Sequence, residues 1–217
     1  MKFFVKNSVG ENAVIQGLLW LLRFVIIGSA LWSLISFDWQ SFFLALLAYV
    51  LSFIPEFIEY RFRAVLPVEF DFAIALFIFL SVFLGEVGDV YERFFWWDAI
   101  LHLSSSFMLG YIAFLWLYIK LQQEKIESSP KIQGLIIFCV AVALGAIWEI
   151  FEFMMDQLFG FNMQKSGLVD TMWDLIVNAI GALAIASIGV LYIKNGGVGP
   201  IRNLTHAFMS QNKLWKR

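Results

Sequence analysis

Long runs of hydrophobic residues, separated by short polar linkers, dominate the pattern along the chain. A helix needs about 20 mostly apolar residues to cross the hydrocarbon core of a bilayer. Six runs are long enough, and we expect transmembrane helices at residues 13–36, 39–58, 70–88, 97–120, 132–155 and 171–193. No repeat, low-complexity tract or domain boundary is visible between them. The pattern therefore predicts an all-α, polytopic membrane helix bundle in which residues 1–217 form a single integral membrane domain.

The composition agrees with this expectation. Hydrophobic residues make up 61% of the chain and charged residues 15%, whereas soluble domains average about 45–50% apolar and about 25% charged residues. The net charge of -2 gives no electrostatic basis for binding nucleic acid. Cys139 is the only cysteine, so an internal disulfide is excluded. We expect membrane lipids, and no nucleic acid, as partners of the chain.

Lysine and arginine are distributed unevenly among the linkers. Cytoplasmic loops of membrane proteins carry an excess of these residues. If the N-terminus is cytoplasmic, the cytoplasmic segments hold Lys2, Lys6, Arg61, Arg63, Lys120, Lys125, Lys131, Lys194, Arg202, Lys213, Lys216 and Arg217. The outer loops then hold only Arg93 and Lys165. We therefore expect a multi-pass protein of the cytoplasmic (inner) membrane with both termini on the cytoplasmic side.

Polar residues interrupt the last apolar run at regular intervals. In GLVDTMWDLIVNAIGAL, residues 167–183, the side chains of Asp170, Asp174 and Asn178 recur every four residues. Four residues are a little over one helical turn, so these side chains share one face of the helix. Ionisable groups are costly inside a bilayer, and such a row indicates a functional site.

Two other helices carry polar residues at the same end. The fourth helix begins with Asp98 and His102 one turn apart, and the fifth ends with Glu149, Glu152 and Asp156 on one face. The expected topology brings both ends to the depth at which the sixth helix begins. Tryptophan, which prefers the membrane–water interface, stands beside these groups at positions 96, 97, 148 and 173. The sequence thus predicts a polar pocket that opens to the outer face.

The residue types in this pocket suit a divalent metal ion. Carboxylates and one imidazole are ligands for hard or borderline ions such as Mg, Mn or Zn. The expected metal ligands are Asp98, His102, Glu149, Glu152 and Asp174. The candidate catalytic residues are Glu152, His102 and Asp174, and the pocket is completed by Asp156, Asp170 and Asn178.

Each of these groups also has a purely structural interpretation. The segment DTMWD resembles a capping pattern, in which Asp170 would cap the sixth helix. Asp174 and Asn178 would suit hydrogen bonds between helices. His102 would equally suit a hydrogen-bonded core position, and Glu149 with Glu152 a membrane interface.

A second polar group lies in PEFIEYRFRAVLPVEFDF, at the cytoplasmic side of the expected topology. Its prolines, Pro55 and Pro67, favour a broken helix or an interfacial turn. Salt bridges and contacts with lipid headgroups account for its charges, among which Glu56 and Glu59 are of open function.

Three segments resemble a known family. FFWWDAILHLSSS, GAIWEIFEFMMDQLFGFNMQ and GLVDTMWDLIVNAIGAL, in this order, resemble the YjdF-like family of bacterial integral membrane proteins, and the resemblance covers residues 55–193. A more distant similarity is to the VanZ-like proteins, which are associated with glycopeptide-antibiotic tolerance and the cell envelope. The VanZ-like pattern is matched here by Asp98, His102, Glu149 or Glu152, Asp174, Asn178 and Gly181. The nearest counterpart of its basic residue upstream of the last motif is Lys165. These resemblances imply a multi-pass protein with an envelope role, and no particular reaction.

Three classes of function remain open on the sequence. The first is a metal-dependent enzyme that acts on a lipid or a lipid-linked envelope intermediate at the outer membrane surface. The second is a non-catalytic envelope accessory or binding protein, whose polar cluster fixes helix packing. The third is a cation or proton transporter, because chains of Asp, Glu and His serve that role in membranes.

Overall fold

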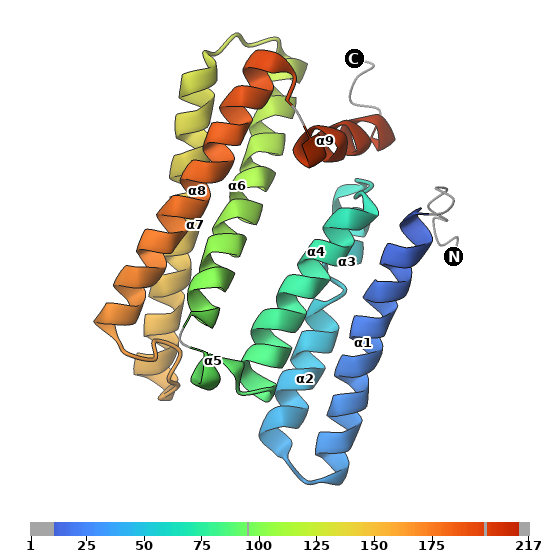
Figure 1. Ribbon diagram of the computed structural model, residues 1–217, viewed down its shortest axis with the longest axis vertical. Coiled ribbons are helices and arrows are strands. Elements are labelled where there is room, and N and C mark those ends of the chain that lie inside the picture. Colours follow the sequence, from blue (N-terminus) through green and yellow to red (C-terminus); the bar gives the residue numbers. More distant parts are fainter. Residues whose placement is uncertain (1–10, 95, 198, 213–217) are drawn as a thin grey trace. The chain divides into compact units, whose positions relative to one another are not determined.

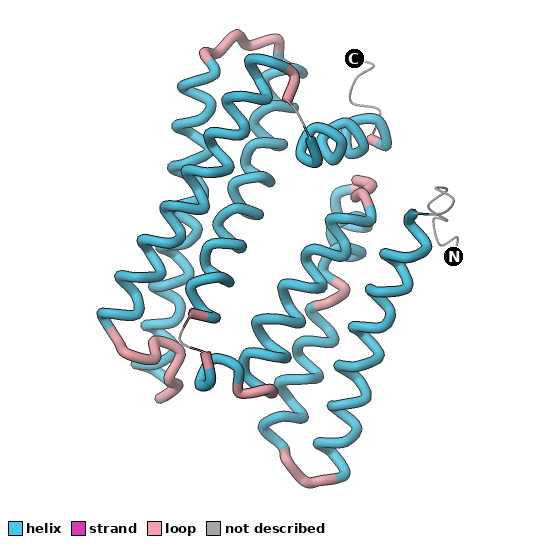
Figure 2. The backbone as a smooth tube through the Cα atoms, in the orientation of Figure 1, coloured by secondary structure: helices cyan, strands magenta, loops and turns pink. Residues whose placement is uncertain are grey.

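The structure is a computed structural model that describes residues 11–94, 96–197 and 199–212 of the chain. Every regular element in these ranges is a helix (Figures 1 and 2), and α4 continues directly into η1 without a loop. The elements are α1 (Glu11–Ile35), α2 (Trp39–Leu51), α3 (Ile54–Phe62), α4 (Val68–Ile78), the π-helix η1 (Phe79–Val87), α5 (Val90–Arg93), α6 (Trp97–Glu124), α7 (Pro130–Phe159), α8 (Leu168–Asn195) and α9 (Gly199–Gln211). The expected all-α, polytopic fold is confirmed.

Six helical spans in the described ranges are long and apolar enough to cross a membrane. They are Ala13–Ile35, Trp39–Arg61, Val68–Val87, Trp97–Glu124, Pro130–Phe159 and Leu168–Asn195. Each overlaps one of the six runs expected from the sequence. The protein is therefore a multi-pass membrane protein.

The last three spans are longer than expected because capping groups set their ends. Ser129 is the N-cap of α7 and accepts a hydrogen bond from the Ile132 amide at 3.3 Å, while Pro130 occupies the first turn. Gly160 and Gly196 end α7 and α8 in the left-handed conformation, with φ of 71° and 75°. The hydrophobic pattern therefore predicts the membrane-spanning part of each helix, whereas the capping residues determine where the helix begins and ends.

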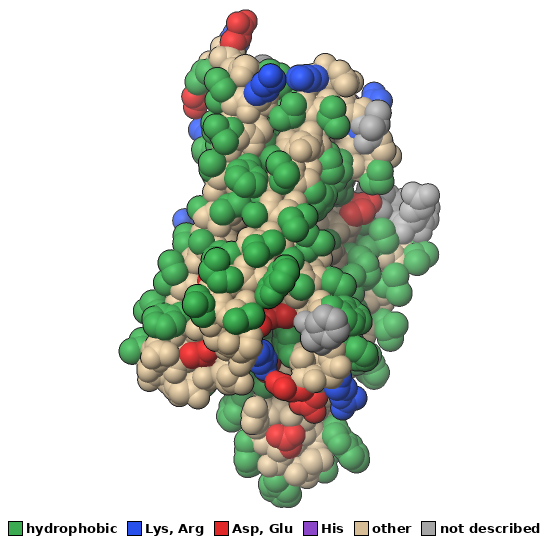
Figure 3. Space-filling view, turned by 60° about the vertical axis from the view of Figure 1, so that its left-hand side comes forward, with side chains coloured by type: hydrophobic (Ala, Val, Ile, Leu, Met, Phe, Trp, Pro, Cys, Tyr) green, Lys and Arg blue, Asp and Glu red, His purple; other side chains and the backbone are tan. Residues whose placement is uncertain are grey.

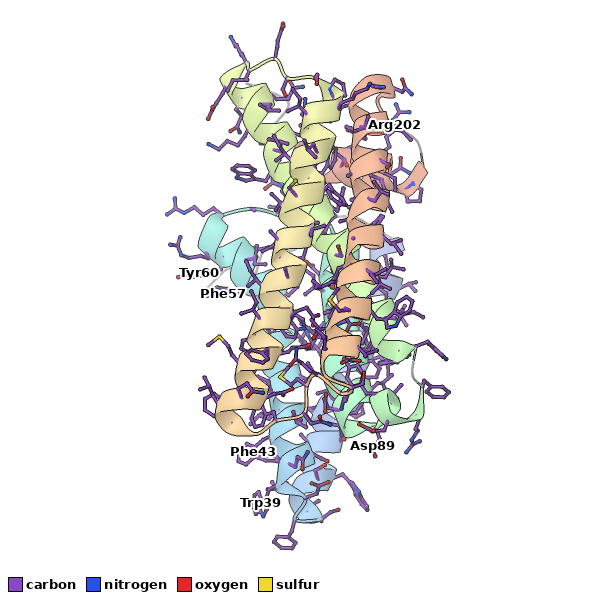
Figure 4. The ribbon with its side chains drawn as sticks, turned by 90° about the vertical axis from the view of Figure 1, so that its left-hand side faces the viewer. Trp39, Phe43, Phe57, Tyr60, Asp89 and Arg202 are labelled. Atoms are coloured by element: carbon purple, nitrogen blue, oxygen red, sulfur yellow. The ribbon has the colours of Figure 1, made fainter. Side chains whose placement is uncertain are left out.

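Large hydrophobic side chains face outward along the helices, as a lipid environment requires. Within the best apolar window of each span, only 22–39% of residues are buried by the protein itself. The space-filling view shows hydrophobic side chains spread over a broad surface (Figure 3). Trp39 and Phe43 of α2, and Phe57 and Tyr60 of α3, likewise point away from their helices (Figure 4). Lipid, not a protein core, covers this apolar surface.

The chain divides into two compact units, which we describe separately. The first comprises Met1–Arg93 with Ala207–Lys213, and the second comprises Phe94–His206 with Leu214–Arg217. A cluster of buried apolar residues forms the core of the first unit: Ile26, Ala30, Ala45, Ala48, Ile78 and Phe83. Whether both units act as the single expected domain stays a prediction.

A buried arginine closes a break between α2 and α3 in the first unit. The helix stops at Leu51 and restarts at Ile54, with Pro55 in the first turn, so the expected broken helix is observed. Arg23 of α1 donates to the Ser52 carbonyl oxygen and to Glu56 Oε1, both at 2.6 Å. Its guanidinium also lies 3.9 Å from the centre of the Phe53 ring. Arg23 thus supplies a hydrogen bond to the Ser52 carbonyl oxygen, which lies at the break and lacks a helical partner.

The second unit is built on α6, α7 and α8, which pack against one another along their lengths. Figure 1 shows these three helices side by side. Gly145 of α7 faces Asn178 of α8, and Gly134 of α7 faces Val190 of α8. Because the contact partners run in opposite directions along the two helices, α7 and α8 are antiparallel.

Candidate functional site

The polar residues expected to form a pocket come together within the second unit. Asp98 and His102 lie near the start of α6, Glu149 and Glu152 near the end of α7, and Asp174 near the start of α8. His102, Glu149, Glu152 and Asp174 are buried, and Asp98 is half-buried. Three helices therefore bring four carboxyl groups, three of them buried, around a single imidazole.

The His102 ring is the centre of this arrangement. Its Nε2 lies 3.5 Å from Asp98 Oδ1 and 4.0 Å from Asp174 Oδ2. Its Nδ1 lies 3.5 Å from Glu149 Oε1 and 3.4 Å from Asn178 Nδ2. One ring nitrogen thus faces the α6 and α8 carboxyl groups, and the other faces α7 and the Asn178 amide.

Several buried oxygens in the cluster lack hydrogen bonds. Among the described residues, no donor reaches Glu149 Oε1, Glu149 Oε2, Asp174 Oδ2 or Asn178 Oδ1. No Lys or Arg of the described ranges forms an ion pair with Glu149, Glu152 or Asp174 either. Burying a charged carboxylate without a partner lowers the stability of the folded protein by an amount on the order of several kcal/mol. The cluster therefore calls for a cation or for protons.

Two groups of residues in the cluster could hold a metal ion. In each of two groups, Asp98–His102–Asp174 and His102–Glu149–Glu152, one ligand atom per residue lies within 4.8 Å of the others. Hard divalent ions prefer oxygen ligands, and zinc accepts carboxylate and imidazole together. The five residues expected to bind metal are the members of these two groups, which share His102.

Glu152 accepts a hydrogen bond from an exposed tryptophan of α7. Trp148 Nε1 donates a hydrogen bond to Glu152 Oε1 at 2.8 Å. Trp148 itself is 48% exposed, whereas Glu152 is buried. The Glu152 carboxyl group therefore lies at the edge of the cluster, between its interior and the outward surface.

Close helix contacts hold the three helices in register at the cluster. A Cβ atom on Gly145 would lie 2.7 Å from Asn178 Nδ2, and one on Gly181 would lie 2.5 Å from the Leu103 carbonyl oxygen. Ser106 Oγ donates to the Asn178 carbonyl oxygen at 2.6 Å. Gly145 was not among the residues predicted for the site, although it precedes Glu149 by one turn on the same face. This four-residue spacing could have indicated that Gly145 lies on the helix face that carries the cluster.

The comparisons with known proteins give a family and no chemistry. The chain matches a family described as "Predicted membrane protein (DUF2238)" over residues 18–195. It belongs to this family. The matched range includes all the residues of the cluster.

One relative of this DUF2238 protein is an uncharacterized protein of Thermotoga maritima. The two are 34% identical over 123 residues, which cover 55% of this chain and 60% of the Thermotoga protein. No solved structure matches the chain. The finer resemblances to YjdF-like and VanZ-like proteins stay predictions.

Two further acidic residues of the DUF2238 protein, Asp156 and Asp170, are not members of the two groups. Asp156 accepts hydrogen bonds from the amides of Met163 and Gln164, at 2.7 and 2.9 Å, and thereby orders the loop between α7 and α8. Asp170 lies half-buried within the first turn of α8. The N-cap of that helix is Gly167, so the interpretation of Asp170 as the cap is wrong. The helix begins earlier than the polar pattern indicates because Gly167, with φ of 68°, allows the chain to turn into it.

Proposed function

We propose that this protein is a divalent-metal-dependent enzyme that acts on a lipid or a lipid-linked intermediate of the bacterial envelope. The observation that carries the proposal is the set of buried carboxylate oxygens without hydrogen bonds around His102. A set of groups that served only to pack helices would satisfy its own oxygens, because unsatisfied polar groups are costly in a membrane.

The ion would be held by the group Asp98–His102–Asp174. Asp98 and Asp174 face Nε2 of the ring, so they and Nε2 form the most direct ligand set. Glu149 and Asn178 face Nδ1, on the side of the ring away from this ligand set, where hydrogen-bond partners orient a ligating histidine. When bound, a divalent ion supplies Lewis acidity toward a phosphoryl or carbonyl oxygen.

Glu152 is the residue best placed to move a proton. The indole of Trp148 holds its Oε1 and leaves Oε2 to accept a proton from water or a substrate hydroxyl. A carboxylate positioned by one hydrogen bond at the edge of a cluster can meet a substrate that a more deeply buried group cannot. We assign Glu152 as the general base.

The location supports a substrate of the membrane interface. With both termini in the cytoplasm, as the distribution of Lys and Arg favours, the cluster lies at the outer end of α6, α7 and α8. Trp96, Trp148 and Trp173 are exposed beside it, as in an interfacial aromatic belt. Few basic residues lie at this end, so an anionic headgroup would rely on the metal ion. The VanZ-like resemblance, with its link to the envelope, agrees with such a substrate.

Transport through the second unit is the weaker alternative. Below the cluster, the space between the three helices is filled by apolar side chains that are almost completely buried, among them Phe114, Ile137 and Ile185. Gly110 packs on Ile185, and Gly189 packs on Phe114 and Ile137, which closes the gaps further. An ion or proton path needs polar groups or water along its length. Among the described residues of this unit, the buried Asp, Glu and His side chains lie at one end only.

Metal analysis of the purified protein tests the proposal. We expect the wild type to hold a divalent ion, and His102→Ala and Asp174→Asn to lose it. His206→Ala is the matched control, because His206 lies in α9 and outside both metal-binding groups. A wild type that binds no divalent ion from a mixture of Mg, Mn and Zn would contradict the proposal, and so would equal loss in all three variants.

Lipid analysis tests the enzymatic part. Membrane lipids from cells that express the wild type, Glu152→Gln or His206→Ala would be compared by mass spectrometry. We expect one lipid or lipid-linked species to be depleted by the wild type and His206→Ala, and retained with Glu152→Gln. Metal binding with no change in any lipid would instead leave a non-catalytic binding protein.

A further inference from the structure

A second site lies on the lipid-facing surface of α7 and α8, at the opposite end of these helices from the polar cluster. It is a groove of about 290 Å³ between Leu135 and Phe138 on α7 and Leu183 and Val190 on α8. Small residues line the bottom of the groove, where Gly134 of α7 packs directly against Ala186 and Val190 of α8. The groove is roughly twice the volume of a 150 Å³ apolar cavity that holds benzene. In a bilayer, an apolar chain must fill it.

Two lysines flank one end of the groove. Lys131 is part of its lining on α7. On α8, Lys194 follows Val190 by four residues and Ser187 by seven, so it continues the stripe that lines the groove. Gly134 packs against Val190, and the antiparallel course of the helices therefore brings Lys131 and Lys194 to the same end. Both are exposed, and within the described ranges neither has a carboxylate at ion-pair distance.

We propose that this groove binds an anionic phospholipid, with an acyl chain along the groove and the phosphate between Lys131 and Lys194. Basic positions between transmembrane helices, next to an apolar surface, are suited to such headgroups. Under the positive-inside topology, this end faces the cytoplasm. The site therefore differs in place and chemistry from the acidic cluster, and it does not depend on the proposed enzymatic function.

A second copy of the chain fits the groove less well. Copies in a membrane are related by an axis along the bilayer normal, so residues at one depth face the same depth in the partner. An interface at this groove would bring four lysines together, two from each copy. Like charges at close range oppose such contact, whereas a phosphate neutralises the lysine pair.

Lipid binding to the full-length protein in detergent tests the assignment. Native mass spectrometry would measure binding of phosphatidylglycerol and of phosphatidylcholine with the same acyl chains. We expect the wild type to prefer phosphatidylglycerol, and Lys131→Gln with Lys194→Gln to weaken that lipid's binding by about tenfold or more. The control is Lys120→Gln with Lys125→Gln, which removes the same charge at the end of α6, outside the groove lining. This control should bind phosphatidylglycerol as the wild type does.

A change in the groove itself separates a lipid site from simple surface charge. Ser187→Phe fills the groove with an aromatic ring, and we expect it to weaken binding of both lipids while elution and thermal unfolding stay unchanged. Equal weakening by the two lysine pairs would overturn the proposal, as would unaltered binding in Ser187→Phe or equal affinity of the wild type for both lipids. Disulfide crosslinking between copies that carry Ser187→Cys in a Cys139→Ser background would also overturn it, in favour of a protein–protein interface.

Discussion

Asn178 Nδ2 lies 3.4 Å from His102 Nδ1, and the buried Oδ1 of the same amide has no donor among the described residues. This contact decides what His102 can do. If the amide nitrogen donates to Nδ1, the ring proton of a neutral His102 is on Nε2 and that atom cannot bind a metal ion. If the amide is turned by 180°, Oδ1 accepts the Nδ1 proton and Nε2 is free for an ion between Asp98 and Asp174. The two amide orientations have nearly the same shape, and an ion bound at Nε2 would select the second.

The first prediction follows from this choice. Asn178→Asp offers only acceptors to Nδ1 when ionised, so we expect it to retain metal binding at His102. Asn178→Leu has a similar volume and no acceptor, and we expect its metal affinity to fall about 10–100-fold, as for other partners of ligating histidines. Competition with a metal-sensitive dye measures both affinities. Loss of metal by Asn178→Asp with retention by Asn178→Leu would contradict the tautomer assignment.

The second prediction concerns the packing behind the cluster. Gly145→Ala places a methyl group 2.7 Å from Asn178 Nδ2, so either the amide or the α7–α8 spacing must shift. We expect a loss of about 1–3 kcal/mol in stability, typical of overpacking, together with weaker metal binding. The matched control is Gly28→Ala in α1, where a new Cβ meets no atom within 4 Å. Thermal unfolding followed by circular dichroism distinguishes the two. Equal unfolding midpoints would show that α7 and α8 tolerate the methyl group.

The third prediction concerns Arg23 in the first unit. Arg23→Leu removes the donor from the Ser52 carbonyl oxygen and leaves Glu56 without its cation. Because Glu56 is 44% exposed, we expect a moderate loss of about 1–3 kcal/mol, below that for a fully buried pair. Adding Glu56→Leu should recover part of the loss, since it removes the unpaired carboxylate. A double-mutant cycle on unfolding midpoints measures this coupling, and strictly additive effects would mean that Arg23 acts through Ser52 and the Phe53 ring alone.

The helices were predictable because their signals are local. Apolar runs long enough for a bilayer identify all six spans, and Pro55 indicates the break before α3. The polar cluster was predictable in outline because spacings of three or four residues fix helix faces, and the alternating direction of successive spans fixes which helix ends meet. The charge bias adds the side of the membrane. The contact of Gly145 with Asn178 and the reach of the Trp148 indole to Glu152 depend on helix rotation and tilt. Rotation and tilt follow from packing between helices, and the sequence of a single helix does not determine them.

The fourth prediction tests the orientation on which the location of both sites rests. Asn162 lies in the loop between α7 and α8, and Glu127 lies in the loop between α6 and α7. In a Cys139→Ser background, we expect Asn162→Cys to react in intact cells with a thiol reagent that does not cross membranes. Glu127→Cys should react only after the membrane is opened. Both positions are exposed, so a difference in labelling reports the side of the membrane and not burial. The reverse pattern would put the acidic cluster at the cytoplasmic face and the lysine pair outside, in conflict with the excess of Lys and Arg expected in cytoplasmic loops.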